Sequence, residues 1–431
     1  MYSQLRVGFL SSSNYFDRRA WSGTLYYMYR SLSALPLQVV PLGIPQKTTG
    51  LWAKIADRLP KPVDVHSEQE GSPRELRKRF AQHLQAQKKF ARIVRRQLRR
   101  TPCDVIFAPA ASSDVFVLKD DIDVPLVYLS DTTFKLLSKN YSQRYAPEAA
   151  GWLERAEEAS LAKAAKIIFP SSWAVDSAIS DYHVSHNVVE AIPFGANIDC
   201  PDNPADCERG RGPMDPCRLL FIGREWHRKG GDVAVEALRA LHARGVKATL
   251  TIVGCTPPEG YSVEGLEGLE IIPYLDKNKP EHRQQFMDLL SQSHLFLLPT
   301  RADCSPIVTF EANAFGLPVV TTDVGGLPEI VTAGKNGYTL PHTATGADFA
   351  GKIAEIMAEP EAYQKLIRTS RGEYDNRFGW QAWGKRVRPI LEQAAKRRVV
   401  DDATDVISSN PLDSIICPWN SHLPQPTTIK L

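Results

Sequence analysis

The sequence predicts an α/β protein made of two domains, each built around a parallel β-sheet. Its 431 residues exceed the usual size of one domain and match two domains of about 200 residues each. Short apolar, β-branched runs alternate with helical stretches along the chain, which is the pattern of βαβ units with parallel strands. One polar segment rich in proline, glycine and aspartate, residues 199–216, interrupts this alternation and is typical of a linker.

The linker divides the chain into two lobes. We assign residues 1–200 to the first lobe, 201–217 to the linker and 218–385 to the second lobe. Residues 386–400 belong to a final helix. Residues 401–431 contain four prolines and no apolar periodicity, so we expect a disordered tail there.

Composition restricts the class of protein. Apolar residues make up 43% of the chain and charged residues 23%, as in a globular protein that folds in water. No apolar run approaches the roughly 20 residues that span a bilayer, and the first apolar run lacks the form of a signal peptide. The seven cysteines include no Cys-x-x-Cys pair, so neither a zinc site nor a disulfide framework is indicated. We therefore expect a reduced, cytoplasmic protein.

Two loops of the first lobe are candidate sites. The strands of this lobe are expected at residues 7–10, 104–108, 125–129, 166–169 and 188–192. Ligands gather at the carboxyl ends of parallel strands, so the loop after the first strand, which ends at Ser22-Gly23-Thr24, is one candidate. An ordinary strand–helix turn is the alternative. Asp131 follows the third strand and can orient a hydroxyl group or accept its proton, or it can cap the helix that begins near Phe134.

The second lobe opens with a strand at 218–223 and a basic loop. This loop contains Gly223, Arg224 and Lys229 and leads into a helix from Asp232. Arg224 supplies a planar fork of donors that suits phosphate oxygens, and Lys229 supplies a point charge on a flexible stem. Further strands are expected at 247–253, 270–274, 295–300 and 318–322.

A second cluster of polar residues lies between the last two of these strands. Asp303 and Glu311 are separated by seven residues, and Ser305-Pro306 between them predicts a helix start. The serine hydroxyl can accept from a free N–H group, and proline suits the first helical position. We expect the helix at 309–315. Its N-terminus, with free N–H groups and a partial positive charge, is a site for a phosphate.

Taken together, these two segments of the second lobe resemble the family-4 glycosyltransferases. The family pattern Glu-Gly-Phe-Pro-x-x-x-x-Glu-Ala corresponds here to DCSPIVTFEA at residues 303–312, with Asp for the first Glu and Cys-Ser for Gly-Phe. The segment at 223–230 resembles the Gly-Arg-x4-Lys-Gly diphosphate clamp of the family, spacing included.

The resemblance implies the GT-B fold, in which two Rossmann-like lobes with parallel sheets face a central cleft. Residues 1–200 would then form the acceptor lobe, and 218–385 would form the donor lobe that holds a nucleotide sugar. The helix at 386–400 would close the junction between them. The implied reaction is retaining transfer of a hexosyl group from a UDP- or GDP-sugar to a glycan or lipid-linked acceptor. Such transfers build cell-surface polysaccharides or glycolipids.

The same resemblance assigns roles to individual residues. Catalytic roles fall on Asp131, Arg224, Lys229 and Asp303. Donor binding is implied for residues at strand ends and at the helix N-terminus: Gly23, Gly223, Arg224, Lys229, Asp303, Ser305, Pro306, Ile307, Val308 and Glu311. Glu311 would hold the ribose hydroxyls and Asp303 the donor-sugar hydroxyls. No metal or cofactor is expected, because Arg224, Lys229 and the helix N-terminus can stabilise the leaving diphosphate. The Asp-x-Asp pattern at 121–123 precedes a strand, the wrong end of a sheet for a ligand.

Two other functions remain open at this point. A nucleotide-sugar 2-epimerase uses the same two-lobe scaffold, but it consumes a sugar nucleotide without an acceptor. A scaffold that binds a sugar nucleotide at a membrane without catalysis is the other alternative, and the intact Arg, Lys and Glu positions argue against it.

A strongly basic helix is expected at residues 73–100. Residues 1–100 carry 19 Lys and Arg against 6 Asp and Glu, whereas the remaining residues carry 33 against 43. The basic face of the helix can be a solvated surface above an apolar stripe, or it can contact anionic lipid headgroups at the inner face of a membrane. Nucleic acid ranks last because no stacking aromatic residues are interleaved with the charges, and we expect no nucleic-acid partner.

Overall fold

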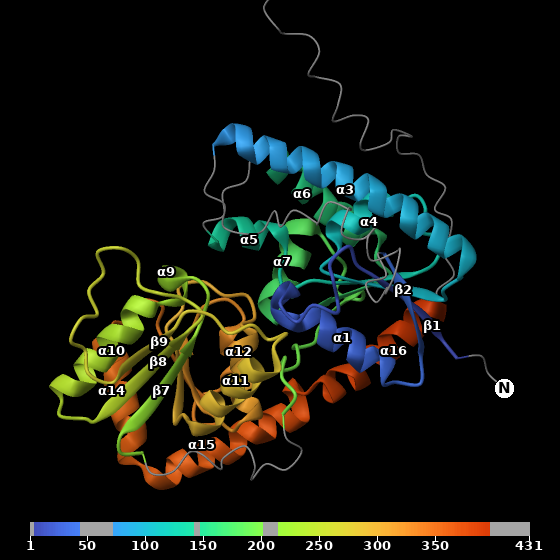
Figure 1. The fold of residues 1–431 in the computed structure, drawn as a ribbon. Helices are drawn as coiled ribbons and strands as arrows, with labels where there is room; N and C mark the ends of the chain where they lie inside the picture. Colours follow the sequence, from blue (N-terminus) through green and yellow to red (C-terminus); the bar gives the residue numbers. More distant parts are fainter. Residues whose placement is uncertain (1–3, 44–71, 142–146, 201–213, 397–431) are drawn as a thin grey trace, which may run out of the picture.

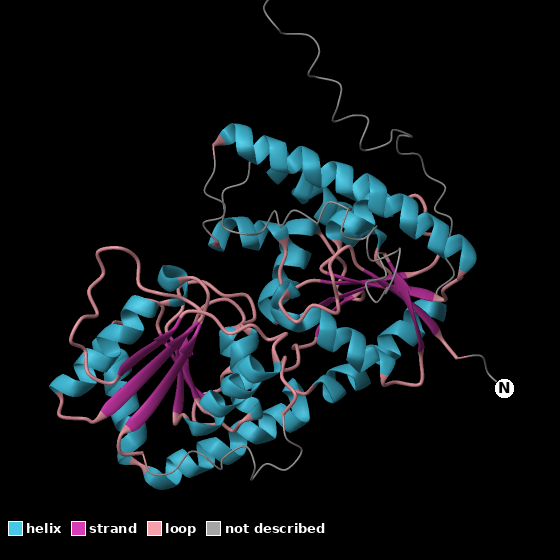
Figure 2. Ribbon diagram, viewed as in Figure 1, coloured by secondary structure: helices cyan, strands magenta, loops and turns pink. Residues whose placement is uncertain are grey.

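The computed structural model describes residues 4–43, 72–141, 147–200 and 214–396. These residues form two lobes, each with a six-stranded parallel sheet between layers of helices (Figures 1 and 2). The predicted α/β class and the division into two lobes are confirmed. The predicted tail at 401–431 and residues 201–213 of the predicted linker lie outside the described residues.

The first sheet consists of β1 (Arg6–Leu10), β2 (Gln38–Leu42), β3 (Val105–Pro109), β4 (Leu126–Leu129), β5 (Lys166–Phe169) and β6 (Val189–Ala191). Its order is β2-β1-β3-β4-β5-β6, with all neighbours parallel. Successive side chains of a strand point to opposite faces, so Phe107 and Ile106 enter two separate cores. Because both faces are covered, the central strands β3 and β4 carry almost only apolar residues.

The second sheet consists of β7 (Cys217–Ile222), β8 (Ala248–Val253), β9 (Leu269–Ile272), β10 (Leu295–Leu298), β11 (Val319–Thr322) and β12 (Gly337–Leu340). Its order is β12-β11-β10-β7-β8-β9, again with all neighbours parallel. From β7 the chain adds β8 and β9 toward one edge of the sheet, and then β10, β11 and β12 toward the other edge, so the strand order switches between β7 and β10. At such a switch point the loops after the two strands diverge and leave a crevice for a ligand.

The helices of the first lobe are η1 (Ala20–Gly23), α1 (Thr24–Ser33), α3 (Pro73–Arg100), α4 (Ser112–Leu118), α5 (Phe134–Asn140), α6 (Pro147–Lys163) and α7 (Ser172–Tyr182). The bounds of α3 match the predicted basic helix. It starts at a capping box, in which the Ser72 hydroxyl accepts the Glu75 N–H and the Glu75 carboxylate accepts the Ser72 N–H. Its apolar stripe, with Phe90 and Val94, packs in the core beneath it.

The helices of the second lobe are α9 (Trp226–Lys229), α10 (Gly231–Ala243), α11 (Pro280–Gln292), α12 (Ile307–Ala314), α13 (Leu327–Ile330), α14 (Gly346–Ala358), α15 (Pro360–Glu373) and η2 (Tyr374–Phe378). They lie on both faces of the second sheet, with α15 along its lower edge in the view of Figure 1.

Strands β2 and β12 were not predicted from the sequence. Both strands form sheet edges, where a strand needs only one neighbour. Pro41 lies within β2 and Gly337 opens β12, and both residue types weaken a strand pattern in the sequence.

The last helix joins the two lobes. It is α16 (Trp380–Lys396), which begins before the predicted bounds of 386–400. Figure 1 shows α15 and α16 running in succession along one side of the molecule, from the second lobe to the first. In the first lobe the Trp383 ring lies 6.0 Å from the Phe107 ring of β3, and the Ser31 hydroxyl donates to the Trp380 carbonyl at 2.7 Å. The chain therefore ends its described course packed on the lobe in which it began.

Candidate active site

One cavity lies where the two lobes meet, at the carboxyl ends of strands from both sheets. Its volume of about 360 Å³ is in the range of small-molecule sites. The first-lobe wall includes Trp21, Asp131 and Tyr141, and the second-lobe wall follows the loops after β7, β9 and β10. The cavity brings together the predicted site residues Asp131, Gly223, Arg224, Lys229, Asp303, Ser305, Pro306, Ile307, Val308 and Glu311.

The predicted basic pair lies on one side of this cavity. Arg224 lies two residues after β7 and is exposed, and its guanidinium carbon is 6.0 Å from the centre of the Tyr274 ring. Lys229 ends the short helix α9, whereas the sequence placed it in a loop. A glycine is required at 223, because a Cβ there would lie 2.8 Å from Lys229 Cγ. Gly230, with φ of 79°, separates α9 from α10 and so aims Lys229 into the cavity.

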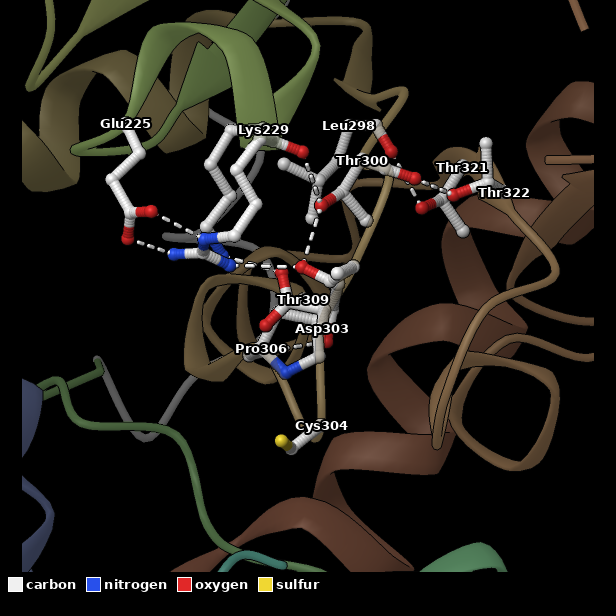
Figure 3. Close-up of polar contacts among 12 residues, drawn as sticks. Glu225, Lys229, Leu298, Thr300, Asp303, Cys304, Pro306, Thr309, Thr321 and Thr322 are labelled. Carbon is white, nitrogen blue, oxygen red and sulfur yellow. Dashed lines mark hydrogen bonds and ion pairs between the residues drawn. The ribbon is translucent and has the colours of Figure 1, made fainter. Parts of the chain in front are cut away.

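Lys229 forms an ion pair with Asp303, as Figure 3 shows. The two side chains are only 12% and 8% exposed. Burial lowers the pKa of Lys229, and the Asp303 carboxylate opposes this effect. The pair joins the loop after β7 to the loop after β10, which are the two loops that diverge at the switch point of the sheet. The ammonium group is thus held by a fixed anion at the cavity wall.

The N-terminus of α12 forms the floor of the cavity, but its start differs from the prediction. The helix begins at Ile307, not at residue 309, and the residue at its N-cap is Pro306, which has no side chain to accept a hydrogen bond. The prediction that Ser305 caps the helix was therefore wrong. Thr309 donates its hydroxyl to the Pro306 carbonyl at 2.6 Å, and the buried Ser305 hydroxyl has no partner among the described residues. The Thr309 N–H also donates to the Pro306 carbonyl, at 3.0 Å. The N–H groups of Ile307 and Val308, which precede the first helical hydrogen bond, are the ones that face a ligand at this helix end.

Glu311 lies one turn into α12 and is fully buried. Its Oε1 accepts from the Lys277 ammonium at 2.5 Å, while its Oε2 has no partner among the described residues. Burial raises the pKa of Glu311, and Lys277 opposes this shift. A buried carboxylate oxygen without a donor is costly. The arrangement therefore calls for a hydroxyl or N–H donor from a ligand in the cavity.

The first-lobe wall carries Asp131 beside a strained loop. Trp21 and Ser22 both adopt left-handed backbone conformations, with φ of 46° and 56°, which are uncommon for residues other than glycine. The Asn197 amide donates to the Ser22 carbonyl at 3.0 Å and supports this conformation. The Trp21 indole N–H donates to Asp131 Oδ2 at 3.4 Å. The alternative that Asp131 caps the following helix was wrong, because Thr133 accepts the Leu136 N–H there.

Gly23 is the one predicted site residue that does not line the cavity, although its neighbours Ser22 and Thr24 do. It is buried with φ of 91°, and a Cβ at this position would lie 3.0 Å from the Arg18 carbonyl oxygen. Its contribution is therefore to the shape of the loop.

Several lining residues were missed by the sequence analysis. Lys277 lies in a polar turn after β9 and Tyr141 at the end of α5, and neither position carries a recognisable pattern. Arg228 lies in α9, next to Lys229, where its Nε donates to Glu225 at 2.6 Å and a terminal nitrogen donates to the Ala302 carbonyl at 2.8 Å. Of these three residues, only Arg228 carried a signal in the sequence, because it lies within the basic motif at 223–230.

No group of three or more His, Cys, Asp or Glu side chains in the described ranges is arranged to hold a metal ion. Metal independence stays a prediction. Within the part of the chain that the structure describes, every helix is too short or too polar to cross a bilayer.

The fold and this site define the GT-B class of two-lobe proteins. Sucrose-phosphate synthase from Thermosynechococcus elongatus superposes with a TM-score of 0.62 at 16% identity, over 91% of this chain and 99% of that one. HepE from Anabaena, in complex with UDP-glucose, superposes with a TM-score of 0.59 at 17% identity, over 90% of this chain and all of that one. The predicted GT-B fold is confirmed.

Part of the second lobe matches a family model. Residues 216–359 match the model of the glycosyl transferases group 1. This matching segment contains both the basic loop at 223–230 and the segment with Asp303 and Glu311.

Curated relatives agree with this match. WcaL of Salmonella typhimurium, a glycosyltransferase named for colanic acid biosynthesis, is 31% identical over 42% of this chain and 46% of its own length. The D-inositol 3-phosphate glycosyltransferase of Saccharomonospora viridis is 26% identical over 62% of this chain and 64% of its own length. The chain thus spans about half to two thirds of these relatives.

Proposed function

We propose that this protein is a retaining glycosyltransferase that moves a hexosyl group from a UDP- or GDP-sugar to a glycan or lipid-linked acceptor. The observation that carries the proposal is the unpartnered Oε2 of buried Glu311, in the same cavity as Arg224 and Lys229. A ribose hydroxyl supplies the donor that Glu311 lacks. The two cations then lie within the same cavity for the diphosphate that follows the ribose.

The chemistry breaks a C–O bond between the sugar and a diphosphate leaving group. Negative charge grows on that diphosphate, and Arg224, Lys229 and the N-terminus of α12 can stabilise it. Donors fixed before the reaction commonly lower such a barrier by several kcal/mol. In the proposed complex Lys229 divides its charge between Asp303 and the phosphate, and Asp303 also accepts from the donor-sugar hydroxyls.

The acceptor enters from the first-lobe side of the cavity, where Asp131 and Trp21 lie. We propose front-face attack, in which the acceptor hydroxyl attacks the carbon that the diphosphate leaves. Its proton passes to the leaving phosphate oxygen. Asp131 orients the hydroxyl in this scheme, and retention of configuration follows from attack on the face from which the leaving group departs.

Thermal unfolding with a panel of UDP- and GDP-sugars tests the donor class. A ligand that binds only the folded state raises stability by about 2.7 kcal/mol at one hundred times its Kd. One nucleotide class is expected to raise Tm, and no shift with either would contradict the donor assignment. Free nucleoside diphosphate should then form only when an acceptor is added. Conversion of the donor sugar without an acceptor would instead identify a 2-epimerase.

The basic surface of α3 is proposed to bring the enzyme to anionic lipids at the inner face of a membrane. Figure 1 places α3 on the outside of the first lobe. Glu75 is the single acidic residue of this helix, and Lys89, Arg92 and Arg96 are among its exposed cations. Each cation near an anionic bilayer contributes about 1 kcal/mol, so several together can hold a protein there reversibly.

Reversing two of these charges is expected to weaken binding to vesicles that contain phosphatidylserine. The double variant Arg92→Glu with Arg96→Glu should reduce the bound fraction at least about tenfold in a flotation assay at low salt. The matched control is Lys365→Glu with Arg368→Glu on α15, which changes the net charge equally and should bind as the wild type does. Equal vesicle binding by the two variants would contradict the membrane proposal and would mean that the basic face of α3 is only a solvated surface.

A further inference from the structure

Tyr141, at the end of α5, crosses from the first lobe to the second-lobe loop that carries Asp303. Its hydroxyl oxygen accepts the backbone N–H of Cys304 at 2.9 Å and lies 3.2 Å from Cys304 Sγ. Cys304 is only 4% exposed, so water has little access to the N–H that Tyr141 satisfies. The Tyr141 hydroxyl of the first lobe thus holds Cys304, the residue directly after Asp303, whose carboxylate is proposed to bind the donor sugar.

The ring of Tyr141 contacts the other side of the same loop. The guanidinium carbon of Arg228 lies 4.9 Å from the centre of the Tyr141 ring, within the range of a cation–π contact. Arg228 also donates to the Ala302 carbonyl at 2.8 Å. Tyr141 therefore holds the Asp303–Cys304 turn directly through Cys304 and indirectly through Arg228.

The back of this turn depends on the first lobe as well. The Gly326 N–H donates to the Cys304 carbonyl at 3.0 Å. Glu329, on α13 just after Gly326, accepts the N–H groups of Ser172 and Trp173 at 2.9 and 3.1 Å. These are the first N–H groups of α7, so a second-lobe carboxylate caps a first-lobe helix. The turn with Asp303 is thereby enclosed by first-lobe elements on two sides.

We propose that Tyr141 is a positioning residue that holds the Asp303–Cys304 turn in place only when the two lobes are closed on each other. The proposal rests on the proposed function and adds a dependence of the donor-sugar carboxylate on the acceptor lobe. Asp303 reaches its working position when the lobe that brings the acceptor is docked. Separation of the lobes removes the Tyr141 hydroxyl, leaves the Cys304 N–H without its acceptor, and exposes the Cys304 thiol.

The test compares Tyr141→Phe with a matched control. Tyr141→Phe keeps the ring against Arg228 and removes only the hydroxyl. Tyr182→Phe removes another first-lobe hydroxyl, which accepts the Lys135 N–H at 3.1 Å outside the cavity. For both variants and the wild type, three quantities are measured: the Kd for UDP or GDP, kcat and KM for the donor, and the alkylation rate of Cys304 by N-ethylmaleimide, read by peptide mass mapping.

Tyr141→Phe is expected to lower kcat at least about tenfold, because a turn displaced by a fraction of an ångström misplaces Asp303. The Kd for the nucleoside diphosphate should change less than about twofold, since its proposed contacts lie in the second lobe. Alkylation of Cys304 should become at least about fivefold faster. Burial raises the pKa of the Cys304 thiol and the Tyr141 hydroxyl opposes this shift, so loss of the hydroxyl alone would slow alkylation. Faster alkylation therefore reports exposure.

Wild-type kcat together with a wild-type alkylation rate in Tyr141→Phe would overturn the proposal, as would equal changes in Tyr182→Phe. Failure of the glycosyltransferase assignment is recognised separately. In that case the wild-type protein itself neither binds UDP or GDP nor releases either from a sugar donor. The alkylation rates still decide whether the Tyr141 hydroxyl holds the Cys304 turn.

Discussion

Replacing Arg224 by alanine is expected to lower kcat by about 10²- to 10³-fold, the typical loss when one preorganised donor to a developing negative charge is removed. The side chain is exposed, and no ion pair links it to another residue of the described ranges, so its loss should leave the fold unchanged. Initial rates with a saturating donor and acceptor measure the effect. Tm should remain within about 2 °C of the wild-type value.

The control for this variant is Arg368→Ala, which removes an exposed arginine of α15 outside the cavity and should keep wild-type kinetics. Lys229→Ala should show a comparable loss of kcat and also a lower Tm. Its removal leaves the Asp303 carboxylate buried without its partner, which typically costs about 3–5 kcal/mol. Near-normal kcat in both Arg224→Ala and Lys229→Ala would contradict the diphosphate clamp.

Glu311→Gln is expected to raise the Kd for the nucleoside diphosphate by about 10- to 100-fold. A hydrogen bond from a hydroxyl group to a charged carboxylate typically contributes about 1.5–3 kcal/mol to the free energy of binding, and the variant loses the charge of this acceptor. The amide keeps the shape of the side chain, so the effect falls on the hydrogen bonds and on the ion pair with Lys277 rather than on packing. Titration calorimetry with UDP and GDP measures the change, with kcat at saturating donor as a second readout.

Glu259→Gln serves as the matched control, because Glu259 is exposed and lies outside the cavity lining. It should bind nucleotide as the wild type does. A Kd for Glu311→Gln that equals the wild-type value would remove the ribose role from Glu311. Its unpartnered oxygen would then require another ligand.

The acid-x7-Glu spacing predicted that Asp303 and Glu311 share one site, and both line the same cavity. It did not predict that the two carboxylates have different partners. Asp303 pairs with Lys229 across 74 positions of the sequence, and Glu311 pairs with Lys277 across 34. The spacing places both acids around one helix start, but the cation that meets each acid comes from another strand's loop.

The helix start itself shows where local rules fall short. Ser305-Pro306 has the composition of an N-cap followed by a first helical residue, yet the helix begins two residues later than Ser305 and Pro306 is its cap. Cys304 is held by Tyr141 and by Gly326, so the backbone before the helix is set by two distant segments. Tertiary contacts override the capping preference of Ser305. Each buried N–H group that they satisfy contributes about as much to the free energy of folding as one N-cap hydrogen bond.

The sequence alone determined the α/β class, the two lobes, most strands and the position of the basic loop with Gly223, Arg224 and Lys229. These features depend on residues close together in the chain: parallel strands buried on both faces are mostly apolar, and the basic residues occupy one short segment. The sequence also pointed to Asp131 on the first-lobe wall, but only the tertiary structure added Trp21 and Tyr141 beside it, facing the second lobe. Tyr141 and Cys304 are 163 positions apart, and their contact depends on how two separately folded sheets dock, which no local pattern encodes.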